Sequence, residues 1–323
     1  MTLANNSNVK TVCIFCDCKN RGGVLTYSLH LANVLTLKGY QVYFISYTPV
    51  NEAMSEILND IKESSNGVYL VDREISLDQK ISKIKDHVNT LTPDYFIPNY
   101  KIDSYAACSG ILNNSIKIVG VCHSDNADEY FTLSRYESVI DMFVCPAEKS
   151  FESLKNKLKH RSDSIFHIPH CVDTVDIKAN YEGGLLKLVY HGRLTEVSKR
   201  VSLLFDVAER LKANGTPFSL TLIGDGDTSK YIEMTQKRNL KGIITIKSAM
   251  SGKELFTELS NYHVELLVSE YEGFCLSLAE SLSLGMPGVA FECGGVINEY
   301  LLDGQTGYLV KQGDIGAVVE KIQ

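Results

Sequence analysis

Short apolar runs alternate with amphipathic stretches along the whole of this 323-residue chain. In the amphipathic stretches, such as residues 25–37 and 78–91, apolar positions recur three and four residues apart, which is the spacing of one helix face. The apolar runs predict strands at residues 11–16, 41–46, 67–71, 94–97, 116–121, 142–145 and 165–168. Because helical patterns separate these strands, the alternation predicts a parallel sheet with helices on both faces.

The alternation restarts after a polar segment, residues 171–184, which has little periodicity and ends in Gly183-Gly184. Beyond it, strands are predicted near residues 186–190, 219–223, 243–246, 264–268 and 288–291. We therefore expect an α/β protein with two doubly wound, Rossmann-like domains, residues 1–176 and 177–323. Ligands of such sheets bind at the carboxyl ends of the strands, so two of them in series predict a binding cleft between the domains.

Composition and charge narrow the classes of protein to which the chain could belong. With 44% hydrophobic and 22% charged residues it is typical of globular proteins. The formal net charge is −7 and neither half is basic, which argues against nucleic acid as the main partner. The nine cysteines lack the regular spacing of a disulfide framework. The N-terminus has no signal-peptide pattern and no apolar run is long enough for a membrane-spanning helix, so the expected location is the cytoplasm.

The segment around residues 269–287 carries the most informative chemistry. An apolar strand runs into a loop containing Glu272 and Gly273, and a helix is expected to begin at Cys275 or Leu276. The free N–H groups and positive dipole of a first helical turn form an anion site, and a glycine lets the backbone approach a phosphate. Glu280, about one turn into the helix, is placed to accept hydrogen bonds from a pair of ribose hydroxyls.

Glu272 and Glu280 have seven residues between them, in the sequence Glu-Gly-Phe-Cys-Leu-Ser-Leu-Ala-Glu-Ser, and Gly-Met-Pro follows at residues 285–287. This segment resembles the E-x7-E motif of retaining GT-B glycosyltransferases, above all glycosyltransferase family 4 (glycosyl transferases group 1). Residues 303–310 continue the family's pattern. The resemblance implies that Gly273, Phe274, Cys275 and Leu276 surround the donor phosphates, that Glu280 binds the ribose and that Glu272 positions the sugar. Two acids at this spacing alone would also fit a solvated helix face.

A second block, Tyr-His-Gly-Arg-Leu at residues 190–194, is followed by Lys199. It resembles the family's Gly-Arg-Leu…Lys element, whose two cations hold the donor diphosphate. A departing nucleotide diphosphate gains negative charge, and fixed cations stabilise it. The resemblance therefore assigns catalytic roles to Arg193 and Lys199. The loop is about one residue longer than the common form, so Arg200 competes with Lys199, which we favour. The alternative is that these cations are ordinary surface residues near the start of a helix.

Two short patterns could indicate a metal. The run Ile-Gly-Asp-Gly-Asp at residues 223–227 contains the Asp-x-Asp spacing, but it also resembles the family's Gly-x-Gly turn at a strand end, which assigns Gly224 to the donor site. Cys13, Cys16 and Cys18 lie on or next to a predicted buried strand, and no second pair of ligands stands at metal-binding spacing. We therefore expect no metal and no cofactor; a nucleotide-sugar would be a substrate.

Three features of the first domain are candidates for function. Gly22-Gly23 follows the first strand, where the family places a loop that faces the donor, although a plain turn would look the same. His123 follows a predicted strand, where family members contact the transferred sugar or the acceptor; a histidine satisfied within the fold is an equal alternative. The basic stretch from Lys149 to Arg161 could touch anionic lipid at the inner face of a membrane, although an ordinary solvated helix is the commoner case.

Taken together, the resemblance implies a hexosyltransferase that retains anomeric configuration without a metal. The implied donor is a UDP-sugar, with a GDP-sugar as the second choice, and the implied acceptor is a glycan or lipid-linked glycan in cell-surface polysaccharide synthesis. The alternative is a nucleotide-sugar sensor or scaffold on the same fold. A dinucleotide oxidoreductase is disfavoured because no Gly-x-Gly-x-x-Gly follows the first strand. The chain ends inside a predicted helix where the family continues, so we expect the second domain to be C-terminally truncated; the alternative is an unusually short tail.

Overall fold

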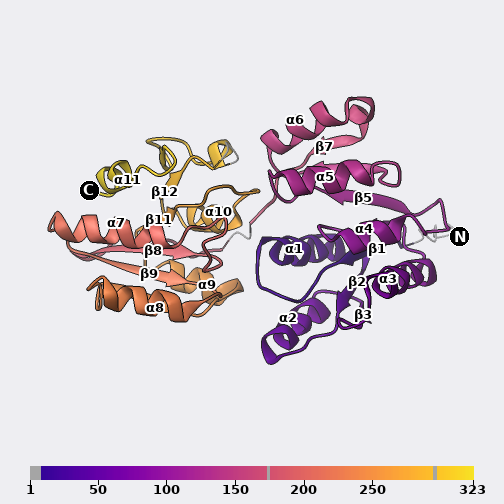
Figure 1. Cartoon of the computed structure of the whole chain (residues 1–323), viewed down its shortest axis with the longest axis horizontal. Helices are drawn as coiled ribbons and strands as arrows, with labels where there is room; N and C mark the ends of the chain where they lie inside the picture. Colours follow the sequence, from indigo (N-terminus) through magenta and orange to yellow (C-terminus); the bar gives the residue numbers. More distant parts are fainter. Residues whose placement is uncertain (1–8, 173–174, 294–296) are drawn as a thin grey trace, which may run out of the picture. The chain divides into compact units, whose positions relative to one another are not determined.

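The computed structural model describes residues 9–172, 175–293 and 297–323, which fall into two compact units (Figure 1). The first unit consists of the chain up to Pro146 together with Ser150–Pro169, and the second of Ala147–Lys149 together with His170–Gln323. The main division therefore falls a few residues before the boundary expected after residue 176. Residues 173 and 174, inside the expected connecting segment, lie outside the described residues.

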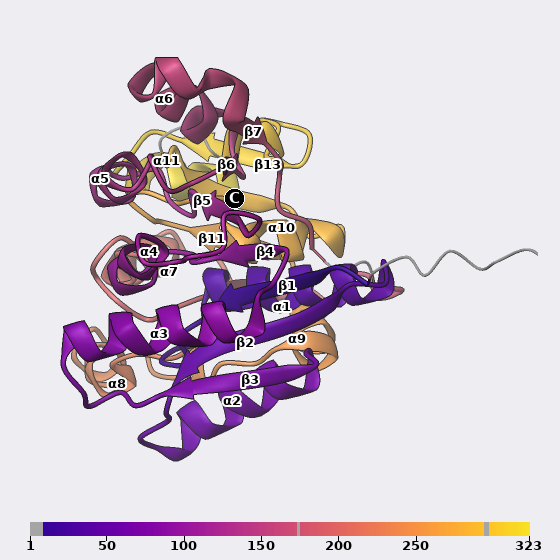
Figure 2. The ribbon, with the colours of Figure 1, turned by 90° about the vertical axis from the view of Figure 1, so that its right-hand side faces the viewer.

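The first unit is built on a seven-stranded parallel sheet. Its elements are β1 (Thr11–Phe15), α1 (Gly23–Leu37), β2 (Gln41–Tyr47), α2 (Glu52–Glu63), β3 (Gly67–Val71), α3 (Leu77–Leu91), β4 (Tyr95–Ile97), α4 (Ile102–Cys108), β5 (Lys117–Val121), α5 (Ala127–Arg135), β6 (Met142–Cys145), α6 (Glu148–Lys157), the 3-10 helix η1 (Lys159–Ser164) and β7 (Ile165–His167). The strand order is β3-β2-β1-β4-β5-β6-β7. Figure 2 shows β1, β2 and β3 side by side.

Alternate residues of the central strand β1 enter two different cores. Val12 and Ile14 pack with α1 and α2, whereas Cys13 and Phe15 pack with α3, α4 and α5. This period of two is what a strand covered on both faces requires. It also separates the cysteines, since Cys13 belongs to one core and Cys16 and Cys18 to the other.

The second unit is built on a six-stranded parallel sheet. Its elements are β8 (Leu186–His191), α7 (Ser202–Ala213), β9 (Phe218–Ile223), α8 (Thr228–Lys237), β10 (Ile244–Lys247), α9 (Gly252–Leu259), β11 (Val264–Leu267), α10 (Leu276–Ser283), β12 (Gly288–Phe291), the 3-10 helix η2 (Ile297–Glu299), β13 (Gly307–Val310) and α11 (Ile315–Ile322). The strand order is β10-β9-β8-β11-β12-β13. The order reverses between β8 and β11, and the carboxyl ends of strands at such a switch point are where ligands of doubly wound sheets bind.

The predicted fold class is confirmed, and all twelve predicted strands are present with ends that differ by at most one residue. The structure has one further strand, β13, which was not predicted from the sequence. It has only four residues, begins with a glycine and follows a turn-forming Asp-Gly, so its pattern is too short to show alternation. Across the described residues, the structure contains no helix with the length and hydrophobicity that a bilayer crossing requires.

Candidate functional site

The loops that follow β8 and β9 pack backbone against backbone. A Cβ atom on Gly224 would lie 1.8 Å from the carbonyl oxygen of Gly192, and one on Gly226 would lie 2.1 Å from that of Leu194. The Leu194 N–H donates to the Asp225 carbonyl at 2.7 Å, and the Asp227 side chain caps α8. Residues 223–227 thus form a turn, and Gly224 has a packing role at the expected place beside the Arg193 loop.

Lys199 and Glu272 form a tight ion pair between the loops after β8 and β11. The Lys199 Nζ lies 2.5 Å from Glu272 Oε1, and the two side chains are only 14% and 8% exposed. Burial lowers the pKa of Lys199, but the negative charge of Glu272, its hydrogen bond and the nearby Cys275 together outweigh burial and leave this pKa above its ordinary value. Lys199 is therefore a cation at neutral pH, held at the edge of the sheet.

The neighbouring cations differ in what they contact. Arg200 is bound within the fold, because its guanidinium lies 2.6 Å from Glu270 Oε1 and donates to Gln312 Oε1 at 3.0 Å. Arg193 is exposed, and within the described part of the chain its guanidinium has no ion-pair or hydrogen-bond partner. It is close enough to Lys199 for its charge to lower the pKa of that lysine. Of the two candidates weighed from the sequence, Lys199 rather than Arg200 thus shares this edge with Arg193.

Glu280 lies on α10, where it contacts the last residue of β8. Its Oε2 is 3.1 Å from Nε2 of His191, whose Nδ1 is 3.1 Å from Oε2 of Glu265 on β11. Glu280 is mostly buried, with 12% of its side chain exposed. The structure thus brings Glu280 together with two residues that the sequence analysis did not select, His191 and Glu265.

The turn before α10 is held in an unusual conformation. Cys275, the residue before the helix, has φ of 62°, a left-handed conformation that side chains other than glycine seldom adopt. The Tyr300 hydroxyl donates to the carbonyls of Phe274 and Cys275 at 2.6 and 3.0 Å, and the Phe274 ring packs 5.2 Å from that of Tyr300. The helix begins at Leu276, as predicted, and no side chain caps its first turn. An anion could therefore approach the N–H groups there.

In the first unit, His123 is fixed by a buried asparagine. His123 Nε2 lies 3.0 Å from Oδ1 of Asn99, whose amide in turn donates to the Phe15 carbonyl and to Ser28 Oγ. The His123 ring also packs edge-on against Tyr27 of α1, 5.1 Å away. Gly22 precedes this helix and Gly23 is its first residue, and a Cβ on Gly22 would have no neighbour within 4 Å. Packing alone therefore does not require glycine at residue 22.

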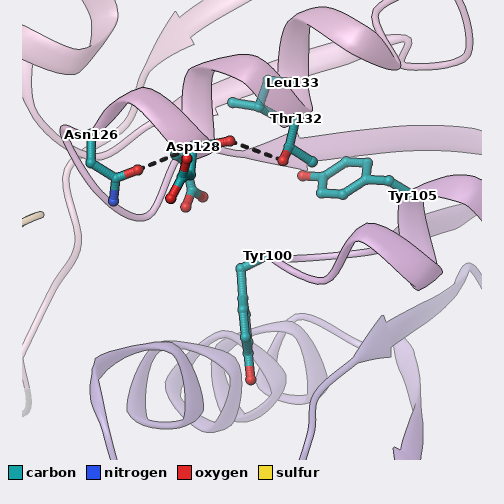
Figure 3. A pocket seen from close by; sticks show the side chains of 7 residues that line it. Tyr100, Tyr105, Asn126, Asp128, Thr132 and Leu133 are labelled. Atoms are coloured by element: carbon teal, nitrogen blue, oxygen red, sulfur yellow. Dashed lines mark hydrogen bonds between the residues drawn. The ribbon is translucent and has the colours of Figure 1, made fainter.

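Beside His123 the first unit has a polar pocket of about 130 Å³, lined by Tyr100, Tyr105, Asn126, Asp128, Glu129, Thr132 and Leu133 (Figure 3). Glu129 accepts a hydrogen bond from the His123 N–H at 2.9 Å, and burial raises the pKa of this carboxyl to about 7. The Tyr105 hydroxyl is buried without a hydrogen-bond partner in the described structure. None of the seven lining residues was predicted from the sequence.

The other sequence candidates behave as parts of the fold. No group of three or more metal-binding side chains occurs among the residues that the structure describes. In the basic stretch, Arg161 donates to the carbonyl of Ile140, while Lys157 lies over the ring of Tyr130. Lys149 and Lys159 are exposed. The stretch thus presents some of its charge to solvent and uses the rest internally.

Comparison with known proteins finds a family match for the second unit. Residues 175–323 match the family described as Glycosyl transferases group 1. We refer to residues 175–323 below as the group 1 domain, after the family model that they match. All four charged candidates of the second unit, Arg193, Lys199, Glu272 and Glu280, lie inside this domain.

Among curated relatives, the chain is 26% identical over 137 residues to the poly(ribitol-phosphate) alpha-N-acetylglucosaminyltransferase of Staphylococcus aureus, a match that covers 42% of this chain and 27% of the relative. It is 30% identical over 162 residues to the lipopolysaccharide 1,6-galactosyltransferase of Escherichia coli, covering 48% and 43%. Each match thus spans less than half of the relative's length, as the group 1 domain spans less than half of this chain.

A solved structure extends the likeness to the whole fold. S. aureus TarM, in complex with fondaparinux, alpha-GlcNAc-glycerol and UDP, superposes with a TM-score of 0.79 at 14% identity, over 97% of this chain and 92% of TarM. Similarity at this identity shows the fold alone: two Rossmann-like domains of the GT-B class, the second of which is the group 1 domain.

Of three site residues that were not predicted, His191 and Glu265 could have been found from the sequence, whereas Asn99 could not. His191 stands inside the quoted Tyr-His-Gly-Arg-Leu run, and Glu265 is a charged residue within a strand of apolar neighbours, so both carried a signal that was not used. Asn99 carried none, because an asparagine after Pro98 reads as an ordinary turn residue. Only the fold brings Asn99 to His123.

Proposed function

We propose that this chain is a glycosyltransferase that moves a hexosyl group from a nucleotide-sugar to a glycan acceptor. The observation that carries the proposal is the edge of the group 1 domain at β8 and β11. There Arg193 has no partner in the described structure, Lys199 is held by Glu272, and Glu280 lies on the first helix beyond them. A dinegative leaving group and a ribose are what this set of charges suits.

Each residue has a role that its contacts support. Arg193 and Lys199 stabilise the negative charge that grows on the departing diphosphate, and the uncapped start of α10 adds N–H donors. Glu280 accepts hydrogen bonds from the ribose hydroxyls. Glu272 keeps Lys199 in place, and its other oxygen would accept hydrogen bonds from the hydroxyls of the sugar. A nucleoside diphosphate bound here would replace solvent around a preorganised set of charges.

The reaction proposed is transfer with retention of anomeric configuration and without a metal. In the front-face form of this mechanism, the leaving phosphate takes the proton of the acceptor hydroxyl as that oxygen attacks the anomeric carbon. The carboxylate of Glu272 is engaged by Lys199, which suits a positioning role better than nucleophilic attack. NMR of the product would show retention; an inverted product would contradict this mechanism without contradicting the transfer itself.

The classes of donor and acceptor are proposed from the similar proteins. TarM was solved with UDP, which favours a UDP-sugar, with a GDP-sugar as the second choice. The names of the S. aureus and E. coli relatives refer to poly(ribitol-phosphate) and lipopolysaccharide, so we propose a cell-surface glycan or its lipid-linked precursor as acceptor. The first unit, with His123, would face the acceptor. A cytoplasmic enzyme that meets lipid-linked acceptors through the exposed lysines between Lys149 and Arg161 fits this scheme.

The experiment that tests the proposal is nucleotide binding followed by turnover. UDP, GDP and ADP are titrated calorimetrically into the wild type and into the variants Arg193→Ala and Glu280→Ala. Matched controls are Lys237→Ala and Glu320→Ala, because both residues are exposed and lie on the last turns of α8 and α11. We expect one nucleotide to bind, both site variants to weaken it, and both controls to leave it unchanged. Absence of binding by all three nucleotides would contradict the proposal.

Release of nucleoside diphosphate from the matching nucleotide-sugar then separates an enzyme from a sensor or scaffold. An enzyme releases the diphosphate faster in the presence of cell-wall or lipopolysaccharide fragments. A protein that binds the nucleotide-sugar tightly but never turns it over would support the sensor instead.

A further inference from the structure

A buried chain of charges connects the core of the group 1 domain to Glu280. Glu265 lies on the central strand β11, is 0% exposed and has apolar neighbours on either side in sequence. Its carboxylate accepts hydrogen bonds from the His191 N–H at 3.1 Å and from Ser281 Oγ at 3.2 Å, in addition to its contact with His191 Nδ1. A carboxylate at such a place is costly unless it is paired, and His191 supplies the pairing charge.

The geometry defines the protonation state of His191. Each of its ring nitrogens lies 3.1 Å from a carboxylate oxygen, one belonging to Glu265 and the other to Glu280. Both nitrogens must donate, which only the imidazolium can do. Burial lowers the pKa of His191, but the two carboxylates outweigh burial and raise it to about 10. The imidazolium therefore persists at neutral pH and bridges β11 to α10.

This bridge leaves one carboxylate oxygen of Glu280 available to a ligand. Its Oε2 faces His191, whereas its Oε1 has no hydrogen-bond partner within the described residues. A glutamate on a helix surface ordinarily samples several rotamers, and fixing one of them before binding removes part of the entropy cost of association. The direction of the free oxygen is thus set by His191, which is itself held by Glu265.

We propose that His191 is a positioning residue for the donor: anchored by Glu265, it orients the carboxylate of Glu280 toward the ribose hydroxyls of the nucleotide. The inference rests on the proposed function and deepens it by assigning a residue outside the two acidic and two basic positions. His191 does not touch the reacting atoms. Its effect lies in the ribose contact, which is equal in the ground state and the transition state.

That equality predicts a kinetic signature. Removing an interaction that substrate and transition state share raises KM and leaves kcat nearly unchanged. In His191→Leu, we expect KM for the nucleotide-sugar to rise about tenfold, since an oriented hydrogen bond to a charged group contributes this much. A variant that merely loosened the domain would lower the active fraction and therefore kcat as well. His191→Gln, whose amide can still donate to Glu280, should recover part of the loss.

The decisive test couples His191 to a single hydroxyl. The nucleoside diphosphate that binds the wild type, and its 2′-deoxy form, are titrated into the wild type, His191→Leu, His191→Gln and Glu265→Gln. We expect deoxygenation to weaken binding to the wild type about tenfold but to change binding to His191→Leu by less than about twofold. Glu265→Gln, which removes the anchoring charge, should lie between them. Thermal unfolding of each variant confirms that it is folded.

Each outcome decides between alternatives. If the 2′-hydroxyl contributes equally to binding in the wild type and in all variants, His191 has only a structural role and the inference is wrong. If the wild type binds none of the three nucleoside diphosphates, the proposed function fails and the inference fails with it. Should His191→Leu not fold, the comparison of wild type with His191→Gln and Glu265→Gln carries the same test.

Discussion

Both units bury charge beside the carboxyl ends of their central strands, but they use it differently. In the first unit, Asp17 follows β1 with 1% of its side chain exposed, and two cations hold it. Arg73 lies 2.7 Å from one of its oxygens and Lys101 lies 3.4 Å from the other. Nearby, the Tyr47 hydroxyl donates to Asp103. Both oxygens of Asp17 are thus held by cations, and these contacts join the loops after β1, β3 and β4.

In the second unit the charges are left partly unmatched. Arg193 has no partner in the described structure, and one oxygen of Glu280 has no hydrogen-bond partner there. The difference teaches that buried charge alone does not mark a site, because internal networks also fix charged groups. What distinguishes the group 1 domain is charge held in place without being fully neutralised.

The largest effect is expected from Lys199→Met. It leaves Glu272 buried without its cation and removes one stabiliser of the leaving diphosphate. We expect activity to fall about 10²–10³-fold and the free energy of unfolding to fall by about 3 kcal/mol. Rates of nucleotide release and urea unfolding measure the two losses. The double variant Lys199→Met/Glu272→Met should recover most of the stability but none of the activity, and recovery of activity would argue against the catalytic role.

The pair of Lys199 and Glu272 shows how much of the site could be predicted from the sequence. Lys199 and Glu272 were both selected because each lies in a motif whose residues are near one another in sequence. Their contact, at 2.5 Å across 73 residues, brings the two motifs together in the fold. The strands were predictable for a similar reason, since local alternation encodes burial on both faces of a sheet.

The rest depended on contacts that no local pattern encodes. Arg73 meets Asp17 across 56 residues, and Asn99 meets His123 across 24, although neither Arg73 nor Asn99 was predicted from the sequence. His191 and Glu265 face each other only because β8 and β11 are neighbours in the sheet. The first unit accordingly yielded fewer of its important residues to sequence reasoning than the second.

The second-largest effect should come from Arg193→Ala, with a different profile. Its guanidinium has no partner to lose within the described chain, so the free energy of unfolding should change by no more than about 0.5 kcal/mol. Activity should nevertheless fall about 10²-fold, because the cation acts only on the departing diphosphate. Parallel urea unfolding and turnover assays, with Lys237→Ala as the matched exposed control, measure the split. A large loss of stability would mean that Arg193 is engaged within the fold like Arg73.

Asp17→Asn tests the buried cluster of Asp17, Arg73 and Lys101 in the first unit. The change leaves Arg73 and Lys101 without their shared carboxylate, and we expect the free energy of unfolding to fall by about 2 kcal/mol. Affinity for the nucleotide should be unchanged, since the cluster belongs to the first unit and is satisfied internally. Urea unfolding and calorimetry measure the two quantities. A loss of nucleotide affinity without a loss of stability would overturn the comparison between the units.

The smallest effect is expected from Glu129→Gln, and it depends on pH. Burial raises the pKa of Glu129 from 4.5 to about 7, so between these values the folded state binds more protons than the unfolded state. Stability should therefore fall as pH rises from 4.5 to 7, the opposite of the usual behaviour of a paired carboxylate.

The glutamine in this variant keeps an oxygen for the His123 N–H and removes the cost of burying a charge. At pH 8 we expect the variant to be more stable than the wild type by about 1 kcal/mol, a rise of a few degrees in Tm, and at pH 4.5 we expect the difference to vanish. Asp128→Asn, on the same turn of α5 but exposed, is the matched control and should show no such trend. A difference in Tm that is the same at both pH values would mean that Glu129 carries its charge without cost. The first unit would then hold a carboxylate as ready for a ligand as Glu280 in the second, and the pocket in Figure 3 would have to be counted as a site of the same kind.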